Sequence, residues 1–219
     1  LGVTSIDVQQ IISSLPVSNM TLELGAAALE AELPELFAEA IADLLADGML
    51  NGKSITVGSE TVVCMVGLFK ASNATAFVAG ATCAKLGELA RTVKSKKFKN
   101  PVIMMSNAVY TKFITDATDD ETTKIYKEGL IRDKMIEDVP VELTDYAPST
   151  GSGASGAWAD NDVIAVAGDK RGYAIAMAGQ LKVTQKETAG ATYSTFDGTA
   201  YAAGKPVIPA NFYQYKIDV

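Results

Sequence analysis

The sequence predicts a mixed α+β fold, and three observations support this prediction. One long helical stripe and two shorter helical segments alternate with short β-like runs, and no segment is repeated. Apolar residues make up 48% and aromatic residues 7% of the 219 positions, which is typical of globular proteins. A chain of this length buries roughly 70–75% of its unfolded surface, so we expect it to fold without a disulfide framework or a structural metal.

The clearest helix is predicted over residues 33–50. Its apolar side chains recur at spacings of three and four residues, which gives one continuous stripe on a helix. Pro34 suits the first turn, where its missing N–H is not needed. Gly52 should end the helix, because glycine readily adopts the left-handed conformation found at helix ends. Residues 4–31 fit both a strand that becomes a short helix and a helix rich in Ala and Leu.

Two further helices are predicted over residues 81–95 and 107–116, with a buried strand between them. This strand, in residues 100–106, is continuously apolar, which implies that both of its faces are covered. Ser106 or Asn107 suits the N-cap of the second helix. Other strands are expected within residues 53–80, 162–169, 171–179, 180–187 and 199–218, and a flexible loop is expected at 147–157.

Residues 132–148 contain a strand that is interrupted by Pro140. Because proline cannot donate to a sheet ladder, we expect this strand to lie at a sheet edge or to carry a bulge. The acidic residues Glu137, Asp138 and Glu142 flank the proline. Together, proline and charge at an edge discourage uncontrolled strand addition.

The composition excludes several kinds of chemistry. The chain has no histidine, which removes histidine-assisted nucleophiles and histidine metal sites. Cys64 and Cys83 are best interpreted as buried thiols. The formal charge of −7 is unfavourable for binding the phosphates of DNA. No apolar run is long enough to span a membrane. The first residues lack an initiator Met, which indicates a processed chain or a fragment.

Three local patterns invite a functional interpretation, and none of them defines an active site. Residues 48–54 end like a phosphate-binding loop, but the spacing is one residue short and the segment follows a helix. Residues 116–121 cluster carboxylates without the ligand spacing of a calcium loop. The basic run at 94–99 includes Lys96 and Lys97, and fits either a solvated helix end or a contact with an acidic protein neighbour. We therefore expect no cofactor, no metal and no catalytic residue.

The order of these segments resembles the major capsid proteins of tailed phages, which have the Hong Kong 97 fold. The long helix ends in "LNG", and "ELARTVKSKK" is followed by the strand-to-helix unit "PVIMMSNAVYTKFITDATD". The segment "EDVPVELTDYAP" is similar to a family strand, with Asp138 near the usual glycine position. Gly168-Asp169 and Gly172-Tyr173 match another family strand, and "PANFYQYKI" is a similar ending. The resemblance covers about residues 30–219.

The resemblance implies a fold of two lobes. Residues 1–74 and 173–219 would form a peripheral lobe that includes the spine helix, and residues 75–172 would form an axial lobe with a central mixed sheet. The family's N-terminal arm and extended loop would be short, removed or absent here, because only about 30 residues precede the predicted helix. The lysine–asparagine crosslinks of some relatives cannot be placed on this sequence.

The implied function is structural: copies of the chain assemble into pentamers and hexamers of an icosahedral virion shell that encloses double-stranded DNA. The implied partners are other copies, with scaffold, portal and decoration proteins as further candidates, and DNA bound only loosely and without sequence preference. The expected subunit contacts are at the edge strand, the glycine-rich loop and the basic run, with the candidate residues Glu137, Asp138, Pro140, Glu142, Gly151, Gly153, Lys96 and Lys97.

Two alternatives remain open from the sequence. An encapsulin-like shell of a bacterial nanocompartment has a similar fold and encloses protein cargo. A small α+β enzyme or ligand-binding domain would have to rely on Asp, Glu, Lys or Tyr for its chemistry. Assembly without a ligand favours a shell protein, whereas a strict monomer with a saturable small-molecule site favours the enzyme.

Overall fold

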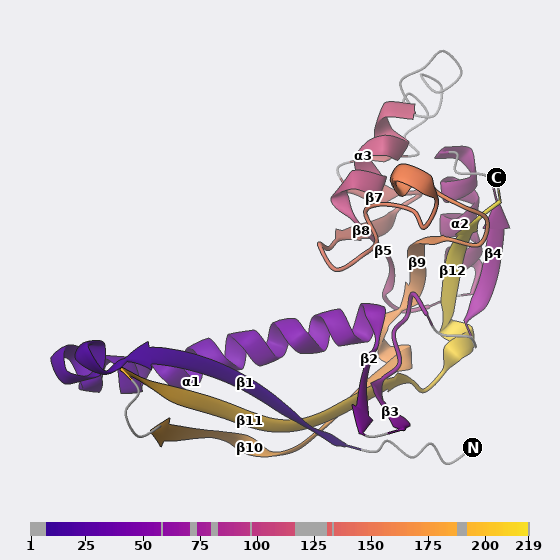
Figure 1. The fold of residues 1–219 in the computed structure, drawn as a ribbon. Coiled ribbons are helices and arrows are strands. Elements are labelled where there is room, and N and C mark those ends of the chain that lie inside the picture. The colour runs from indigo at the N-terminus through magenta and orange to yellow at the C-terminus, as the bar shows by residue number, and fades with distance from the viewer. Residues whose placement is uncertain are drawn as a thin grey trace. The chain divides into compact units, whose positions relative to one another are not determined.

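The computed structural model describes residues 8–57, 59–70, 74–79, 83–96, 98–116, 131–132, 134–187 and 192–218. The chain divides into two compact units (Figure 1). Unit 1 comprises Leu1–Met49, Lys53–Met65 and Ile175–Lys205. Unit 2 comprises Leu50–Gly52, Val66–Ala174 and Pro206–Val219.

Unit 1 contains one long helix and a five-stranded sheet. The helix α1 (Asn19–Asn51) lies along a ribbon of three long strands, as Figure 1 shows. In the sheet, β11 pairs with β1, β3 and β10, and β3 also pairs with β2. The strands are β1 (Gln9–Ser18), β2 (Lys53–Val57), β3 (Glu60–Met65), β10 (Tyr173–Glu187) and β11 (Tyr193–Pro206).

The core of unit 1 is small. One cluster of its buried side chains contains Val17, Leu33, Phe37 and Phe196, each at most 9% exposed. The ring of Phe37 lies directly against Gly198 of β11, where an added Cβ would come within 2.6 Å of the ring carbons. Close contact between helix and sheet therefore depends on the absence of a side chain at this position.

A buried carboxylate connects the three strands of the ribbon. Asp197 of β11 is 6% exposed. Its carboxylate accepts a hydrogen bond from Ser14 Oγ of β1 at 2.6 Å, and it forms an ion pair with Lys186 of β10 at 2.5 Å. The hydrogen bond from Lys186, followed by that from Ser14, lowers the pKa of Asp197 below its ordinary value. We call these three residues the Asp197 cluster.

Unit 2 is built on a mixed seven-stranded sheet in the order β4-β12-β9-β5-β8-β7-β6. The β4–β12 and β5–β8 pairs are parallel, and the other pairs are antiparallel. Two helices, α2 (Cys83–Ser95) and α3 (Asn107–Asp116), complete the unit. The strands are β4 (Thr75–Ala79), β5 (Pro101–Met105), β6 (Ile131–Arg132), β7 (Met135–Ile136), β8 (Val139–Leu143), β9 (Val163–Asp169) and β12 (Phe212–Ile217).

The core of unit 2 is large and includes residues from both helices and the central strands. In β5 and β9, neighbouring residues are buried without the alternation of a half-exposed strand, as predicted for a strand covered on both faces. Tyr215 of β12 is fully buried, with its ring edge-on to Phe77 and stacked on Phe113 at centroid distances of 5.5 and 6.1 Å. This packing fixes the central strands of the sheet.

Several predictions about individual elements are confirmed. The α+β class is correct, α3 has the predicted limits, and α2 is described from Cys83 to the predicted end at Ser95, while residues 81–82 lie outside the described residues. Val109 N donates to Ser106 Oγ at 3.3 Å, so Ser106 caps α3. Gly52 ends α1 with a φ of 78°. Cys64 is a buried thiol whose Sγ donates to Val62 O at 3.7 Å, and the side chain of Cys83 lies outside the described residues.

The predicted start of α1 was wrong. The helix begins at Asn19 and continues through Pro34, which we had placed in the first turn. Pro34 is exposed, and it lacks the N–H that would otherwise donate to the carbonyl four residues earlier. Similarly, the two strands expected at 171–179 and 180–187 form one strand, β10.

The last strand, β12, lies in a different unit from the predicted one. β12 pairs with β4 and β9 and therefore belongs to the sheet of unit 2, whereas we had grouped the whole of 173–219 with the long helix. The names of the two lobes remain a prediction at this point. Among the described residues, no helix is long and apolar enough to cross a membrane.

Candidate intersubunit surfaces

Glu137 and Asp138 form the two-residue turn between β7 and β8. Their φ values are 49° and 61°, the positive values that both central residues of a type I′ hairpin turn require. Cations of α2 approach both carboxylates: Arg91 Nε lies 3.1 Å from Glu137 Oε1, and Lys94 Nζ lies 3.0 Å from Asp138 Oδ2. The two predicted contact residues therefore already have partners within their own chain. Exposed pairs of this kind typically contribute about 0–1 kcal/mol.

Pro140 does not lie at a sheet edge, so that prediction was wrong. β8 pairs with β5 on one side and with β7 on the other. Pro140 faces Met135 of β7 and precedes the β5 ladder, which begins at Val141. The missing N–H thus removes no bond from that ladder. Glu142 forms an ion pair with Lys170, so it too has a partner within the chain.

The glycine-rich segment 147–157, predicted as a flexible connector, is an ordered loop held by its own hydrogen bonds. Gly151 N donates to Gly156 O, and Gly153 N donates to Ala157 O, both at 2.9 Å. A Cβ on Gly151 would lie 2.1 Å from Ala157 O, so the two sides of the loop approach too closely for any other residue at this position.

Asp162 fixes this loop from outside. Its carboxylate accepts hydrogen bonds from Ser152 N (2.8 Å), Ser152 Oγ (2.7 Å) and Ala159 N (2.8 Å). The backbone bond from Ala159, followed by the bonds from Ser152, lowers the pKa of Asp162, so the carboxylate stays charged at neutral pH. The loop is thereby presented in one conformation, which reduces the entropy lost when it binds.

Of the two predicted lysines, Lys96 is exposed just after the end of α2, and its backbone N donates to Val93 O at 3.2 Å. Lys97 lies outside the described residues. Residues 117–130, which include most of the predicted acidic cluster, also lie outside them. Among the residues that the structure describes, no group of three His, Cys, Asp or Glu side chains could hold a metal ion.

The segment from Gly168 to Tyr173 is a structural corner rather than a site. Asp169 caps a short 3₁₀ turn, and its buried carboxylate receives Arg171 Nη2 at 2.7 Å and Nε at 3.1 Å. Hydrogen bonds from Arg171 lower the pKa of Asp169 to about 2. The Tyr173 hydroxyl is buried and has no hydrogen-bond partner in the described structure, and burial raises its pKa.

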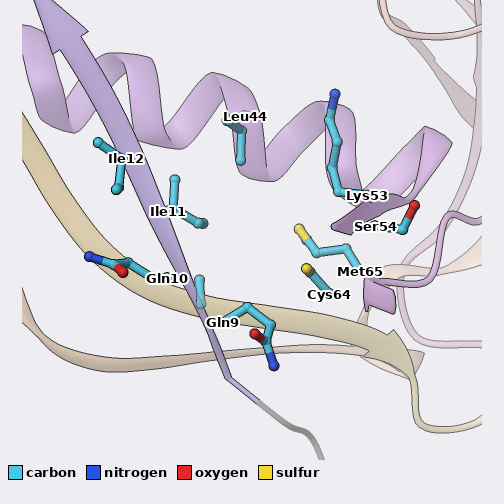
Figure 2. Close-up of a pocket in the computed structure, with 10 residues that line it drawn as sticks. Gln9, Gln10, Ile11, Ile12, Leu44, Lys53, Ser54, Cys64 and Met65 are labelled. Carbon is cyan, nitrogen blue, oxygen red and sulfur yellow. The ribbon is translucent and has the colours of Figure 1, made fainter. Parts of the chain in front are cut away.

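Two apolar cavities lie beside α1, and no pattern in the sequence indicated them. One has a volume of about 220 Å³ and lies between α1, β1 and β3. Figure 2 shows Leu44 contributed by α1, Ile11 and Ile12 by β1, and Cys64 and Met65 by β3. The other lies between α1 and β10, and its volume is about 210 Å³. Neither could be predicted, because the pairing of β1 with β11 joins residues more than 170 positions apart.

Among the residues whose exposure the structure describes, unit 1 also exposes more large apolar side chains than unit 2. In unit 2 the exposed members are Met135, Val207 and Ile208. In unit 1 they are Ile12, Leu36, Val62, Val63, Ile175, Met177, Tyr193 and Tyr201. These side chains make up the large apolar part of the described surface of unit 1.

Comparisons with known proteins bear on the role of this surface. A family model described as the phage capsid family matches residues 1–217. No curated protein matches the chain. The capsid of an empty GTA particle is similar in structure, with a TM-score of 0.65 and 14% identity over 97% of this chain and 74% of that chain.

Two phage structures give the same result. The structure of Gordonia phage Cozz has a TM-score of 0.60 and 14% identity, over 97% of this chain and 70% of that chain. The structure of Mycobacterium phage Adephagia has a TM-score of 0.58 and 15% identity, over 97% of this chain and 72% of that chain. At identities this low, the structural similarity demonstrates a shared fold.

Proposed function

Because this chain belongs to the phage capsid family, we propose that its copies dock edge to edge into pentamers and hexamers that close into an icosahedral head around double-stranded DNA. The chain is a major capsid protein, a structural component of the virion and not an enzyme. The observation that carries the proposal is the family match over 1–217. Repeated docking of unlike surfaces closes rings, which is how a single chain can make both kinds of capsomer.

We assign unit 1 to the peripheral lobe and unit 2 to the axial lobe. Unit 1 contains the long helix α1 and the three-stranded ribbon, and unit 2 contains the mixed sheet. This assignment keeps the predicted roles of the lobes while moving residues 50–52, 66–74, 173–174 and 206–219 to the axial one. Contacts of unit 1 would then join neighbouring subunits at their periphery, and contacts of unit 2 would close the ring.

Within unit 2, the 151–157 loop is the strongest candidate for such a closing contact. Its glycines approach each other closely, and Asp162 holds it in one conformation without any ligand. The other candidates are weaker, because Glu137, Asp138 and Glu142 already form ion pairs within the chain and Pro140 lies on a strand that is paired on both sides. Lys96 is an exposed cation suited to a salt-sensitive contact between copies.

Packaged DNA should touch this shell only weakly. The formal charge of the chain is −7, and affinity for DNA without sequence preference comes mainly from lysines and arginines that neutralise phosphates. Shells should therefore form without nucleic acid. Scaffold, portal and decoration proteins remain candidate partners that assembly from the purified chain alone would not require.

Negative-stain electron microscopy and light scattering of the purified, nuclease-treated chain test the proposal. We expect closed shells or capsomer rings at micromolar concentration. A deletion of residues 150–156 should leave the subunit folded, as circular dichroism would show, and should strongly reduce the number of particles. A chain that remains a monomer at every concentration would contradict the proposal, and small shells filled with host protein would favour an encapsulin-like compartment.

A further inference from the structure

The cavity between α1 and β10, which we call the α1–β10 groove, is apolar along its whole length. From α1 it is lined by Ala38, Ala42 and Leu45, and from the ribbon by Met177 and Tyr201, among other residues. Its volume is about 210 Å³. Met177 is 60% exposed and Tyr201 is 45% exposed at its border, so the groove is open to another molecule.

The same chain carries an exposed apolar turn at Val207 and Ile208, which we call the 207–208 turn. These residues lie between Pro206 and Pro209 and are 43% and 50% exposed. The carbonyl of Gly172 accepts hydrogen bonds from Val207 N at 2.8 Å and from Ile208 N at 3.2 Å. Two prolines and two backbone bonds thus fix the turn before it binds, so docking it costs little conformational entropy.

Charge favours this turn as the occupant of the groove. The outer face of α1 beside the groove carries Glu35, Glu39 and Asp43, and the sequence of α1 contains no lysine or arginine. The segment 204–212, in contrast, contains one lysine and no carboxylate. Copies with a formal charge of −7 repel one another, so a contact between them is favoured where an apolar segment without acidic residues meets an apolar groove.

We propose that the 207–208 turn of one copy inserts into the α1–β10 groove of a second copy. The contact joins two different surfaces, so each copy offers both a turn and a groove, as ring closure requires. It is too small to hold two copies together alone, because stable interfaces bury about 1,200–2,000 Å². It therefore forms as part of a larger shell contact, and this inference rests on the assembly proposed above.

Cysteine crosslinking between copies tests the pairing. In a background with Cys64→Ala and Cys83→Ala, one tagged chain carries Ile208→Cys and a second, differently tagged chain carries Ala42→Cys. A disulfide requires Cα atoms within about 7 Å, so oxidation of mixed shells should give a dimer that contains both tags. The matched control replaces Ile208→Cys by Met135→Cys, another exposed apolar residue of unit 2.

Shells that form but show no more 42–208 crosslinking than the control would overturn the inference and leave the assembly proposal intact. A parent chain that forms no shells would overturn both. Ile208→Asp provides a second test, with Met135→Asp as its control. We expect Ile208→Asp to reduce shell yield by about tenfold or more at an unchanged melting temperature, since burial of one apolar side chain corresponds to such a factor. Equal yields from the two variants would contradict the pairing.

Discussion

The two units of the chain differ in how fully each buries its own apolar surface. Unit 2 has a core with residues from α2, α3 and five strands, and its central strands are buried on both faces. The described core cluster of unit 1 has only four buried residues, and the unit also has a buried carboxylate at Asp197 and two open apolar cavities. The comparison indicates that unit 2 buries more apolar surface by its own packing, and in the proposed assembly neighbouring copies would complete the surface of unit 1.

The largest effect is expected from a cavity in unit 2. Ile103 lies in the central strand β5 and is fully buried, so Ile103→Ala should destabilise the chain by about 2–5 kcal/mol. Ile12→Ala makes the same chemical change in unit 1, where the side chain is 54% exposed, and should change stability by about 0.5 kcal/mol or less. Urea unfolding of the unassembled chain measures both. Equal losses would contradict the proposed difference between the units.

The next effect concerns acid stability in unit 2. Arg171 lowers the pKa of Asp169 to about 2 from an ordinary value of 3.8, so the carboxylate stabilises the fold at neutral pH. That contribution is complete above about pH 4 and is lost as the pH falls through about 2. In Asp169→Asn the unfolding free energy should be lower at pH 7, and its difference from the parent should shrink as the pH falls from about 4 to about 2.

The matched control for Asp169 is Asp145→Asn, because Asp145 is an exposed acid in the same unit. Its acid unfolding should follow that of the parent chain. In unit 1, Asp197→Asn should also remove an acid-dependent contribution, because Lys186 and Ser14 lower the pKa of Asp197. Parallel pH profiles for the parent, Asp169→Asn and Asp197→Asn would show that these two carboxylates do not stabilise the fold.

A smaller effect on stability, but a clear one on assembly, is expected at the 151–157 loop. Asp162→Asn replaces one acceptor oxygen by an NH₂ group and so breaks bonds to Ser152 or Ala159. We expect a stability change of about 1 kcal/mol or less and a reduced particle yield. Ser149→Ala, at an exposed position beside the loop, should leave both unchanged. Normal assembly by Asp162→Asn would remove the loop from the candidate contacts.

The smallest structural effect is expected at Lys96. Lys96→Glu changes an exposed residue, so the unfolding free energy should move by about 0.5 kcal/mol or less. If Lys96 meets an acidic neighbour, assembly of the variant should weaken at low salt, and high salt should reduce the difference from the parent. Lys112→Glu, an exposed change on α3, serves as the control. Identical salt profiles for the parent and Lys96→Glu would indicate a solvated helix end.

Local signals in the sequence predicted much of unit 2. The periodicity of α2 and α3, the cap at Ser106 and the continuous apolar run of β5 all depend on neighbouring residues. Unit 1 depends on distant residues instead. β1 pairs with β11 from the other end of the chain, and Ser14 meets Asp197 only through that register. No pattern within either segment specifies such a pair.

The errors at the candidate surfaces have physical causes as well. Glu137 and Asp138 were expected to discourage strand addition at a sheet edge. Instead, they form ion pairs with Arg91 and Lys94 of α2. These pairs depend on how α2 packs in the tertiary fold, which the local sequence does not specify. The glycines at 147–157 predicted a flexible loop, but the loop has a defined conformation. They are required by close backbone contacts, and Asp162, which fixes the loop, lies five residues beyond it.

Hydrogen exchange of the unassembled chain and of assembled shells, followed by mass spectrometry, tests the central claim most directly. If neighbouring copies complete unit 1, amides of the outer strands β1 and β10 should exchange more slowly in shells, while those of β5 and β9 should exchange at the same rate in both states. Protection gained only in unit 2, with β1 and β10 unchanged, would contradict the account.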